Sequence, residues 1–417
     1  MTYERAQSAI LRGRLDEYPI FMIVVAGPRQ VGKSTMVRRV LDGYPSAFVA
    51  VDQPLNEFDP FAEGAATMTT SLAIPGEAPT AEWLIQHWMQ ARAKAKALPQ
   101  GQCFVLAIDE IQKIARWSEV VKGLWDADRA SGLNLHVILL GSSPWLMQKG
   151  LSESLAGRYE LIRMSHWSYS ETQEAFDFSL DEYLYFGGYP GSARLIREEP
   201  RWRGYIRGAL IHPNIEKDIL QMTRVDKPAL LKNLFELGCN YSGQIISYTK
   251  LMGQLQDAGN TVTLAHYLDL LSQAGLLSGL SKYAGEQHRQ RSSSPKLNAL
   301  NTALISALSG YSFAEARADR SHWGHLVESA VGAHLCNTAT DNCQVQYWRE
   351  SPNEVDFVLN DGRRLLAIEV KSGKTYATPK GLSIFAGKYQ QARQLIVGAG
   401  GIPLTEFLTY PAQYWLE

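Results

Sequence analysis

The chain has 417 residues, 45% of them hydrophobic and 20% charged, a composition typical of a globular protein with two or three domains. Its formal net charge of −1 excludes an overall basic field, so any affinity for nucleic acid must come from a local patch. Four cysteines without metal-site spacing indicate reduced thiols in a cytoplasmic protein. No run approaches the ~20 apolar residues that cross a bilayer, so we expect no membrane anchor.

A phosphate-binding motif directly follows an apolar run at residues 21–26. It fits G-x-x-x-x-G-K-[S/T], in which backbone N–H groups of a glycine-rich turn and the next helix N-terminus hold phosphate oxygens. Lys33 is expected to reach the terminal phosphates in a catalytic role, and Ser34 to bind Mg²⁺. The alternative is a glycine turn that ends a core strand. The residues predicted to hold a nucleoside triphosphate are Gly27, Pro28, Arg29, Gln30, Val31, Gly32, Lys33, Ser34 and Thr35.

Two adjacent carboxylates follow a second apolar run, at residues 103–109, which predicts a buried parallel strand. Asp109, where this strand emerges, is placed to hold the water shell of Mg²⁺. Glu110 is expected to polarise the attacking water and so to be catalytic. Any junction of strand and loop can carry an acidic pair, but its position downstream of a phosphate loop favours the catalytic interpretation.

A third apolar run, at residues 135–141, ends in Ser142 and Ser143. In ATPases whose sheet has an extra strand between the phosphate-loop strand and the Asp-Glu strand, this position carries a polar sensor near the γ-phosphate. Ser142 or Ser143 is the candidate. Further on, Arg158 is a candidate catalytic finger that stabilises charge, either in its own chain or in a neighbouring subunit. The alternative is a solvated surface arginine.

These motifs and one more occur in a fixed order: Gly27 to Ser34, Asp109 to Gln112, Leu155 to Arg158, and Gly187 to Pro190. As a set they resemble the prokaryotic AAA-type ATPases (AAA_14) that carry a winged-helix segment and a C-terminal, nuclease-like domain of the DUF4143 type. The resemblance implies an ATPase core that binds ATP and Mg²⁺ through Lys33, Ser34, Asp109 and Glu110. It implies no known biological process.

Strand-like and helical patterns alternate in the first part of the chain, which predicts a parallel α/β sheet covered by helices. The expected strands are 21–26, 46–52, 103–109, 135–141 and about 160–164, and one helix is expected at 82–98. Between residues 52 and 80 we expect a long loop beside the nucleotide site. The predicted domains are a P-loop ATPase core (1–170), a helical lid (171–227), a winged helix-turn-helix (228–294) and an α/β nuclease-like domain (295–417).

The segment 228–283 has the order of a winged helix-turn-helix: three helical patterns, at 228–246, 247–258 and 261–274, and then a strand-like run. Thr261 or Thr263 is expected to cap the third helix, which would present Thr263, His266 and Tyr267 to DNA. Basic residues follow at Lys282, His288, Arg289, Arg291 and Lys296. DNA contact through 261–296 is one interpretation. Docking of a protein, or a flexible linker at the end of this segment, is the other.

A second constellation of charged residues lies near the C-terminus. Asp356, a turn at 360–362, and then Glu369 and Lys371 predict two strands of a hairpin with these side chains on one face. Two carboxylates that converge can bind a divalent ion. The pattern resembles the PD-(D/E)xK nucleases, a resemblance that implies a helix acid, Glu328, in the same site. The alternative is ordinary alternation on a half-buried strand.

Two functional hypotheses follow. In the first, the protein hydrolyses ATP to ADP and phosphate, and its nucleotide state controls a C-terminal nuclease-like or DNA-binding domain. In the second, it is a non-hydrolysing, nucleotide-gated switch that binds DNA or protein. Homo-oligomers are expected if Arg158 acts on a neighbouring subunit. One departure from the family pattern lies in residues 295–301, Pro295 to Asn301: relatives often have an aspartate shortly after the Pro-Lys pair, and any role of that carboxylate is absent here.

Overall fold

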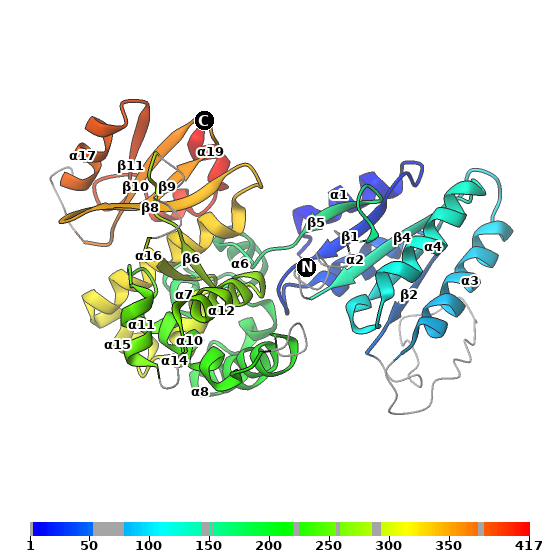
Figure 1. The fold of residues 1–417 in the computed structure, drawn as a ribbon, viewed down its shortest axis with the longest axis horizontal. Helices are drawn as coiled ribbons and strands as arrows, with labels where there is room; N and C mark the ends of the chain where they lie inside the picture. The colour runs from blue at the N-terminus through cyan, green and yellow to red at the C-terminus, as the bar shows by residue number, and fades with distance from the viewer. Residues whose placement is uncertain are drawn as a thin grey trace. The chain divides into compact units, whose positions relative to one another are not determined.

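The computed structural model describes residues 3–52, 79–142, 151, 154–219, 225–255, 259–285, 293–373 and 379–417. The chain forms two compact units (Figure 1). The smaller one contains residues 4–28 and 32–164, and the larger one contains residues 29–31 and 165–417. Most of the predicted loop at 52–80, together with Ser143, lies outside the described residues.

The smaller unit, blue and cyan in Figure 1, is built on a five-stranded sheet in the order β2-β3-β4-β1-β5. All of its neighbouring strands are parallel. The strands are β1 (Met22–Ala26), β2 (Ser46–Ala50), β3 (Phe104–Asp109), β4 (Leu135–Gly141) and β5 (Tyr159–Arg163). All five predicted strands are confirmed and differ only at their ends. The extra strand is present, because β4 lies between β1 and β3.

Helices cover this sheet: α1 (Ala6–Leu15), α2 (Lys33–Leu41), α3 (Ala81–Ala97) and α4 (Trp117–Ala130), with a short 3-10 turn η1 (Ile111–Lys113). On α3 the buried residues recur at helical spacing, for example Leu84, Trp88, Ala91 and Ala95. They pack with α4 and with side chains of β1, β3 and β4 into one core. Because β1, β4 and β3 are parallel neighbours, their carboxyl ends lie at one edge of the sheet.

The larger unit begins with helices α6 (Tyr169–Phe176) and α7 (Leu180–Phe186). Each starts in a capping box, made by Ser168 with Glu171 and by Ser179 with Glu182. A short 3-10 segment η2 (Pro190–Leu195), helix α8 (Glu199–Tyr205) and the π-helical turns η3 (Ile206–Ile211) and η4 (Asn214–Ile219) follow.

Three helices and a two-stranded antiparallel sheet come next: α10 (Pro228–Asn240), α11 (Tyr248–Gln254), α12 (Thr261–Gln273), β6 (Leu277–Leu280) and β7 (Lys296–Ala299). Helix α10 ends earlier than predicted because Gly243, at φ +82°, turns the chain and donates its N–H to the Leu297 carbonyl. The predicted cap of α12 is wrong. Asn260 fills that position, and its side chain accepts the Thr263 N–H at 2.8 Å.

The last part has a four-stranded sheet in the order β11-β10-β9-β8, with β10 and β11 parallel and the other neighbours antiparallel. Its elements are α14 (Thr302–Leu308), α15 (Phe313–Ala318), α16 (Arg320–Thr338), β8 (Gln344–Glu350), β9 (Asn353–Asn360), β10 (Leu365–Lys371), α17 (Lys380–Lys388), β11 (Ala392–Gly398), α18 (Leu404–Phe407) and α19 (Ala412–Leu416). The predicted hairpin is confirmed, with Asn360 accepting the Gly362 N–H at its turn.

The predicted division of the larger unit into lid, winged helix and C-terminal domain stays a prediction. Residues 165–417 form one compact unit, and the pairing of β6 with β7 spans the boundary expected after residue 294.

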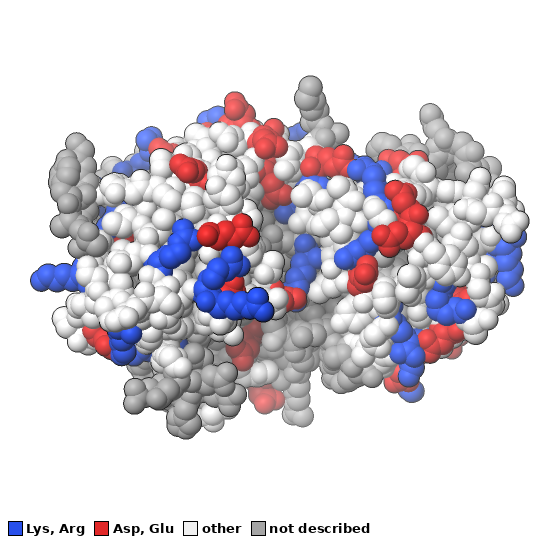
Figure 2. Space-filling model, turned by 90° about the horizontal axis from the view of Figure 1, so that it is seen from above, with Lys and Arg blue, Asp and Glu red and all other residues white. Residues whose placement is uncertain are grey.

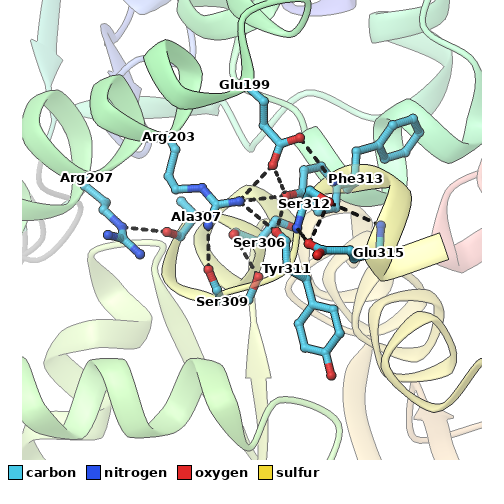
Figure 3. Close-up of polar contacts among 11 residues, drawn as sticks. Glu199, Arg203, Arg207, Ser306, Ala307, Ser309, Tyr311, Ser312, Phe313 and Glu315 are labelled. Carbon is cyan, nitrogen blue, oxygen red and sulfur yellow. Dashed lines mark hydrogen bonds and ion pairs between the residues drawn. The ribbon is translucent and has the colours of Figure 1, made fainter. Parts of the chain in front are cut away.

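A polar clamp joins α8 to the segment after α14 (Figure 3). Arg203 donates to the backbone carbonyls of Ser309 and Tyr311, each at 2.7 Å, and pairs with Glu199 at 2.8 Å. The second oxygen of Glu199 accepts the Phe313 N–H. The bond to Ser309 satisfies the carbonyl of the residue that caps α14, a position where helix carbonyls lack partners of their own, and the bond to Tyr311 holds the segment that follows. The clamp therefore holds helices from different parts of this unit together.

We expect the smaller unit to lose stability in mild acid. Burial lowers the pKa of His136, on β4, from 6.5 to about 4, although its ring bonds to the Glu17 carbonyl. In the unfolded chain, His136 binds a proton as pH falls below 6.5, whereas in the folded chain it binds one only near pH 4. Stability is therefore complete above that window and falls through it as pH drops, by up to about 3 kcal/mol.

Urea unfolding, measured as a function of pH, should show this loss of stability as a slope. His136→Gln should flatten it, whereas the exposed His266→Gln should not; equal slopes in all three proteins would contradict the assignment.

Candidate functional site

The phosphate loop begins where β1 ends, and its first glycine has no space for a side chain. A Cβ on Gly27 would lie 1.9 Å from the Met164 carbonyl oxygen. At the other end of the loop, Gly32 has φ +90° and precedes α2, whose first residue is Lys33. The buried ammonium group of Lys33 donates to the carbonyls of Gly27 and Pro28 at 2.9 and 2.8 Å. The lysine is thus held over the loop where terminal phosphates are expected.

Ser34 and Asp109 meet across the edge of the sheet. Ser34 Oγ donates to Asp109 Oδ2 at 2.5 Å, and Asp109 is 8% exposed. Burial raises the pKa of Asp109, against the hydrogen bond from Ser34, which lowers it. A hydroxyl and a carboxylate held together are the donors that Mg²⁺ uses beside a nucleotide. Thr35, the next residue, is exposed on α2.

The carboxylate of Glu110 is fixed by two neighbours. Ser142 Oγ, at the end of β4, donates to Glu110 Oε2 at 2.8 Å, and Gln112 Nε2 donates to the same oxygen at 2.6 Å. Lys113 Nζ lies 3.8 Å from this oxygen. The structure thus brings the predicted sensor serine to the predicted catalytic acid. Sequence reasoning assigned no role to Gln112, although it stands in the Asp-Glu-Ile-Gln motif; its spacing from Glu110 was the signal.

The middle of the phosphate loop, residues 29–31, groups with the larger unit. There the indole N–H of Trp167 donates to the Val31 carbonyl at 3.0 Å, and the Tyr205 hydroxyl donates to Gln30 Oε1 at 3.5 Å. Trp167 is itself stacked on Phe176. Residues 29–31 are therefore hydrogen-bonded to side chains of the larger unit.

The structure does not bring Arg158 to the nucleotide site of its own chain. Its carbonyl accepts the Met22 N–H at the start of β1, whereas the phosphate loop follows the end of that strand. Five strand residues separate the two ends, about 16 Å at strand spacing. The guanidinium pairs with Asp126 at 2.7 Å. A role in its own chain is thus not supported, and a role in a neighbouring subunit stays a prediction.

The Gly187-Gly188 motif is packed too tightly for side chains. A Cβ on Gly187 would lie 2.0 Å from Asn301 Oδ1, and one on Gly188 would lie 2.1 Å from the Trp167 carbonyl oxygen. Asn301 accepts the N–H groups of Gly188 and Ala303, and its amide nitrogen lies 3.3 Å from His166 Nδ1. Asn301, at the end of the segment that departs from the family pattern, is therefore a buried residue with hydrogen bonds to several neighbours.

The four residues of the predicted second site lie on one side of the C-terminal sheet, but they are already paired. Glu328 projects from α16 and Asp356 from β9, and Asp356 Oδ2 accepts the Val370 N–H at 2.8 Å. On β10, Lys371 Nζ lies 2.6 Å from Glu369 Oε1. Burial raises the pKa of Glu369 and raises that of Glu328 to about 7. Among the residues described, no group of three or more His, Cys, Asp or Glu side chains is arranged to hold a metal ion.

The predicted DNA-contacting surface needs two corrections. Tyr267 is 3% exposed, so α12 buries it instead of presenting it, while His266 is exposed. Lys296 is fully buried and ion-paired, so it is not part of an exposed wing. Its burial follows from its position at the start of β7, next to α16 and β9. Of the other predicted basic residues, His288, Arg289 and Arg291 lie outside the described part of the chain.

Comparison with known families fits this geometry. Residues 20–173 match the AAA domain family, AAA_14. Residues 177–315 match a domain of unknown function, DUF8612, and residues 323–406 match another, DUF4143. The fold and the site therefore define a P-loop ATPase domain of the AAA type, followed in the same chain by a DUF4143 domain. Nucleotide binding and hydrolysis are the general activity of this class.

The chain is similar to uncharacterized proteins of Mycobacterium tuberculosis and Mycobacterium bovis, at 27% identity over 96% of this chain and 81% of each relative. Among solved structures it is similar to a Walker-type ATPase of Pyrococcus abyssi (17% identity, 74% of this chain and 96% of that one, TM-score 0.49). A second similar solved structure is that of the Orc1 protein of Aeropyrum pernix in complex with DNA (12% identity, 76% of this chain and 94% of that one, TM-score 0.31). Within the described residues, no helix is long and apolar enough to span a membrane.

Proposed function

We propose that the protein hydrolyses ATP to ADP and phosphate at the edge of the smaller unit's sheet, with Lys33, Ser34, Asp109 and Glu110 as its working residues. The observation that carries this proposal is the joint placement of two pairs. Ser34 bonds to Asp109 at 2.5 Å, and Glu110 is held by Ser142 at 2.8 Å.

The residues fit Mg²⁺, which supplies charge neutralisation at the β- and γ-phosphates when bound with the nucleotide. Ser34 and Asp109 would hold it, directly or through water. Lys33 exchanges its carbonyl partners in the loop for phosphate oxygens. Glu110 orients the attacking water and accepts its proton, and Ser142 and Gln112 keep this carboxylate in place.

The nucleotide state is proposed to act on the larger unit through residues 29–31. Phosphate oxygens bind the backbone of this loop, and the Val31 carbonyl is tied to Trp167. The Trp167 carbonyl in turn contacts the Gly187-Gly188 motif. A shift of the loop on ATP binding therefore changes the packing of residues that lead into helices α6 and α7.

DNA as the partner has less support than a protein. The exposed positions of α12 include Thr261, Val262, His266 and Asp269, and the helix contains no Lys or Arg. On the face shown in Figure 2, basic and acidic side chains of the described residues are interspersed without a continuous basic band. A cluster of basic side chains on one surface is the usual footprint of phosphate contacts. We therefore propose a protein as the partner of residues 261–296, with DNA as the outcome that the next experiment tests.

The test is phosphate release from ATP by wild type and Lys33→Ala, each with and without duplex DNA. We expect Mg²⁺-dependent turnover in wild type, no turnover in Lys33→Ala, and no stimulation by DNA. Stimulation by DNA would replace the protein partner with a nucleic acid. ATP binding without turnover in wild type would favour the non-hydrolysing switch. Arg39→Ala, on the exposed side of α2, is a matched control for loss of a cation and should keep full turnover.

A further inference from the structure

The carboxylate cluster of the C-terminal sheet already contains a cation, the ammonium group of Lys296. Its Nζ atom lies 2.6 Å from Glu328 Oε1, 3.7 Å from Asp356 Oδ1 and 3.8 Å from Glu354 Oε1. It also donates to the Asp356 backbone carbonyl at 3.1 Å and lies 4.8 Å from the centre of the Phe357 ring. The side chain is 0% exposed. A fully buried charge of this kind is stable only when it is paired, and here three carboxylates surround it.

The lysine is held in this position by its backbone. Lys296 pairs with Leu280 of β6 and forms a bridge with Ile245 on its other side. Its carboxylate partners come from α16 and β9, which pack in the same unit. Strand pairing on both sides therefore fixes the Lys296 backbone beside the cluster, and the ammonium group joins the β6–β7 hairpin to the C-terminal sheet.

A divalent ion does not fit the side chains as they are arranged. Mg²⁺ requires oxygen ligands at about 2.0–2.1 Å in octahedral geometry. Glu328 Oε1 contacts Lys296, Asp356 Oδ2 accepts the Val370 N–H, and Glu369 Oε1 contacts Lys371. Glu369 Oε2 is buried without a hydrogen-bond partner among the described residues, but one free oxygen does not make a metal site. Two ammonium groups in the cluster also repel a further cation.

We infer that Lys296 takes the place of a divalent ion in this cluster, so that the C-terminal domain binds no catalytic metal and does not cleave nucleic acid. The Lys296 ammonium group instead fastens the β6–β7 hairpin to the C-terminal sheet. This inference concerns a site apart from the nucleotide site and does not depend on ATP hydrolysis.

The test is Mn²⁺ binding to the nucleotide-free full chain, followed by electron paramagnetic resonance. All proteins carry Asp109→Asn, so that the nucleotide site contributes no signal. We expect no Mn²⁺ bound at the cluster in the protein that keeps its native lysine and carries only Asp109→Asn, called the Lys296 protein below. Lys296→Met should gain one Mn²⁺ site, because removing the ammonium group leaves three carboxylates uncompensated. Its affinity for Mn²⁺ should be at least about tenfold higher than that of the same cluster with Lys296 present. Adding Asp356→Asn should abolish the gained site. Lys388→Met, which removes an exposed lysine of the same domain, should gain nothing.

Two results of the Mn²⁺ binding experiment would overturn the inference. One is Mn²⁺ bound to the Lys296 protein and lost in Asp356→Asn. The other is a folded Lys296→Met protein that gains no Mn²⁺ site. If Lys296→Met does not fold without metal, comparing Mn²⁺ binding by the Lys296 protein and by Asp356→Asn still decides the matter. Cleavage of DNA or RNA with Mn²⁺ that disappears in Asp356→Asn would also refute the inference. Mn²⁺ should raise the melting temperature of Lys296→Met but not that of the Lys296 protein.

Discussion

Replacing Glu110 by glutamine will lower ATP turnover by about 10²- to 10⁴-fold and leave ATP bound. The amide keeps the size of the side chain and its acceptor oxygen for Ser142, but it cannot take a proton from the attacking water. General-base catalysis contributes about 10²- to 10⁴-fold to a rate, so the loss should fall in that range. Phosphate release and nucleotide binding, measured on the same preparation, separate the two effects.

Ser142→Ala serves as the graded companion to this variant. It removes one of the two hydrogen bonds that hold Glu110 Oε2, while Gln112 keeps the other at 2.6 Å. A hydrogen bond worth about 1 kcal/mol corresponds to a loss of roughly five- to tenfold in rate. Full turnover in Glu110→Gln, or an equal loss in both variants, would show that Glu110 is not the base.

The substitution Gly187→Ala will strongly destabilise the larger unit. Gly187 adopts φ +67° and ψ −168°, a conformation that is essentially restricted to glycine. Its Cβ would also lie 2.0 Å from Asn301 Oδ1 and 2.6 Å from the Ala303 nitrogen. Backbone strain and the forced movement of a buried hydrogen-bonding residue together cost about 3–5 kcal/mol.

Gly204→Ala is the matched control. Gly204 lies in α8 of the same unit, and a Cβ there meets nothing within 4 Å. Alanine is the better helix former, so this change should be neutral or stabilising by up to about 1 kcal/mol. Urea unfolding of both variants gives the comparison. A difference between them of less than about 1 kcal/mol would mean that Gly187 is not under the restraint described.

The nucleotide site could be predicted because its signals are local. A strand, a glycine turn and a helix N-terminus are adjacent in the sequence, and Asp109 and Glu110 directly follow a continuous apolar run. Parallel strands place their carboxyl ends at one edge, so the contacts of Ser34 with Asp109 and of Ser142 with Glu110 follow from the strand order. The role of Gln112 needed the turn geometry at Glu110, which has φ 56°.

Side-chain burial in the larger unit could not be predicted in the same way. In the sequence, Lys296 stands beside a serine-rich segment and looks like one of several exposed basic residues. In the structure, α16 and β9, which are distant in the chain, bury it among carboxylates. Tyr267 has helical spacing compatible with either face of α12, and packing decided for the interior. The motif around Arg158 could be recognised in the sequence, but its position could not. Strand direction places Arg158 at the edge of the sheet opposite to the phosphate loop.

The sequence by itself determined the phosphate loop, the parallel strands and the order of the elements, since each depends on neighbouring residues and on periodicity. The tertiary structure decided which charges are paired. Electrostatic pairing depends on distances of a few ångströms between residues far apart in the chain, and burial strengthens it by removing water. For that reason Glu328 and Asp356, two of the residues that resemble a metal site in the sequence, enclose a lysine together with Glu354 in the folded protein.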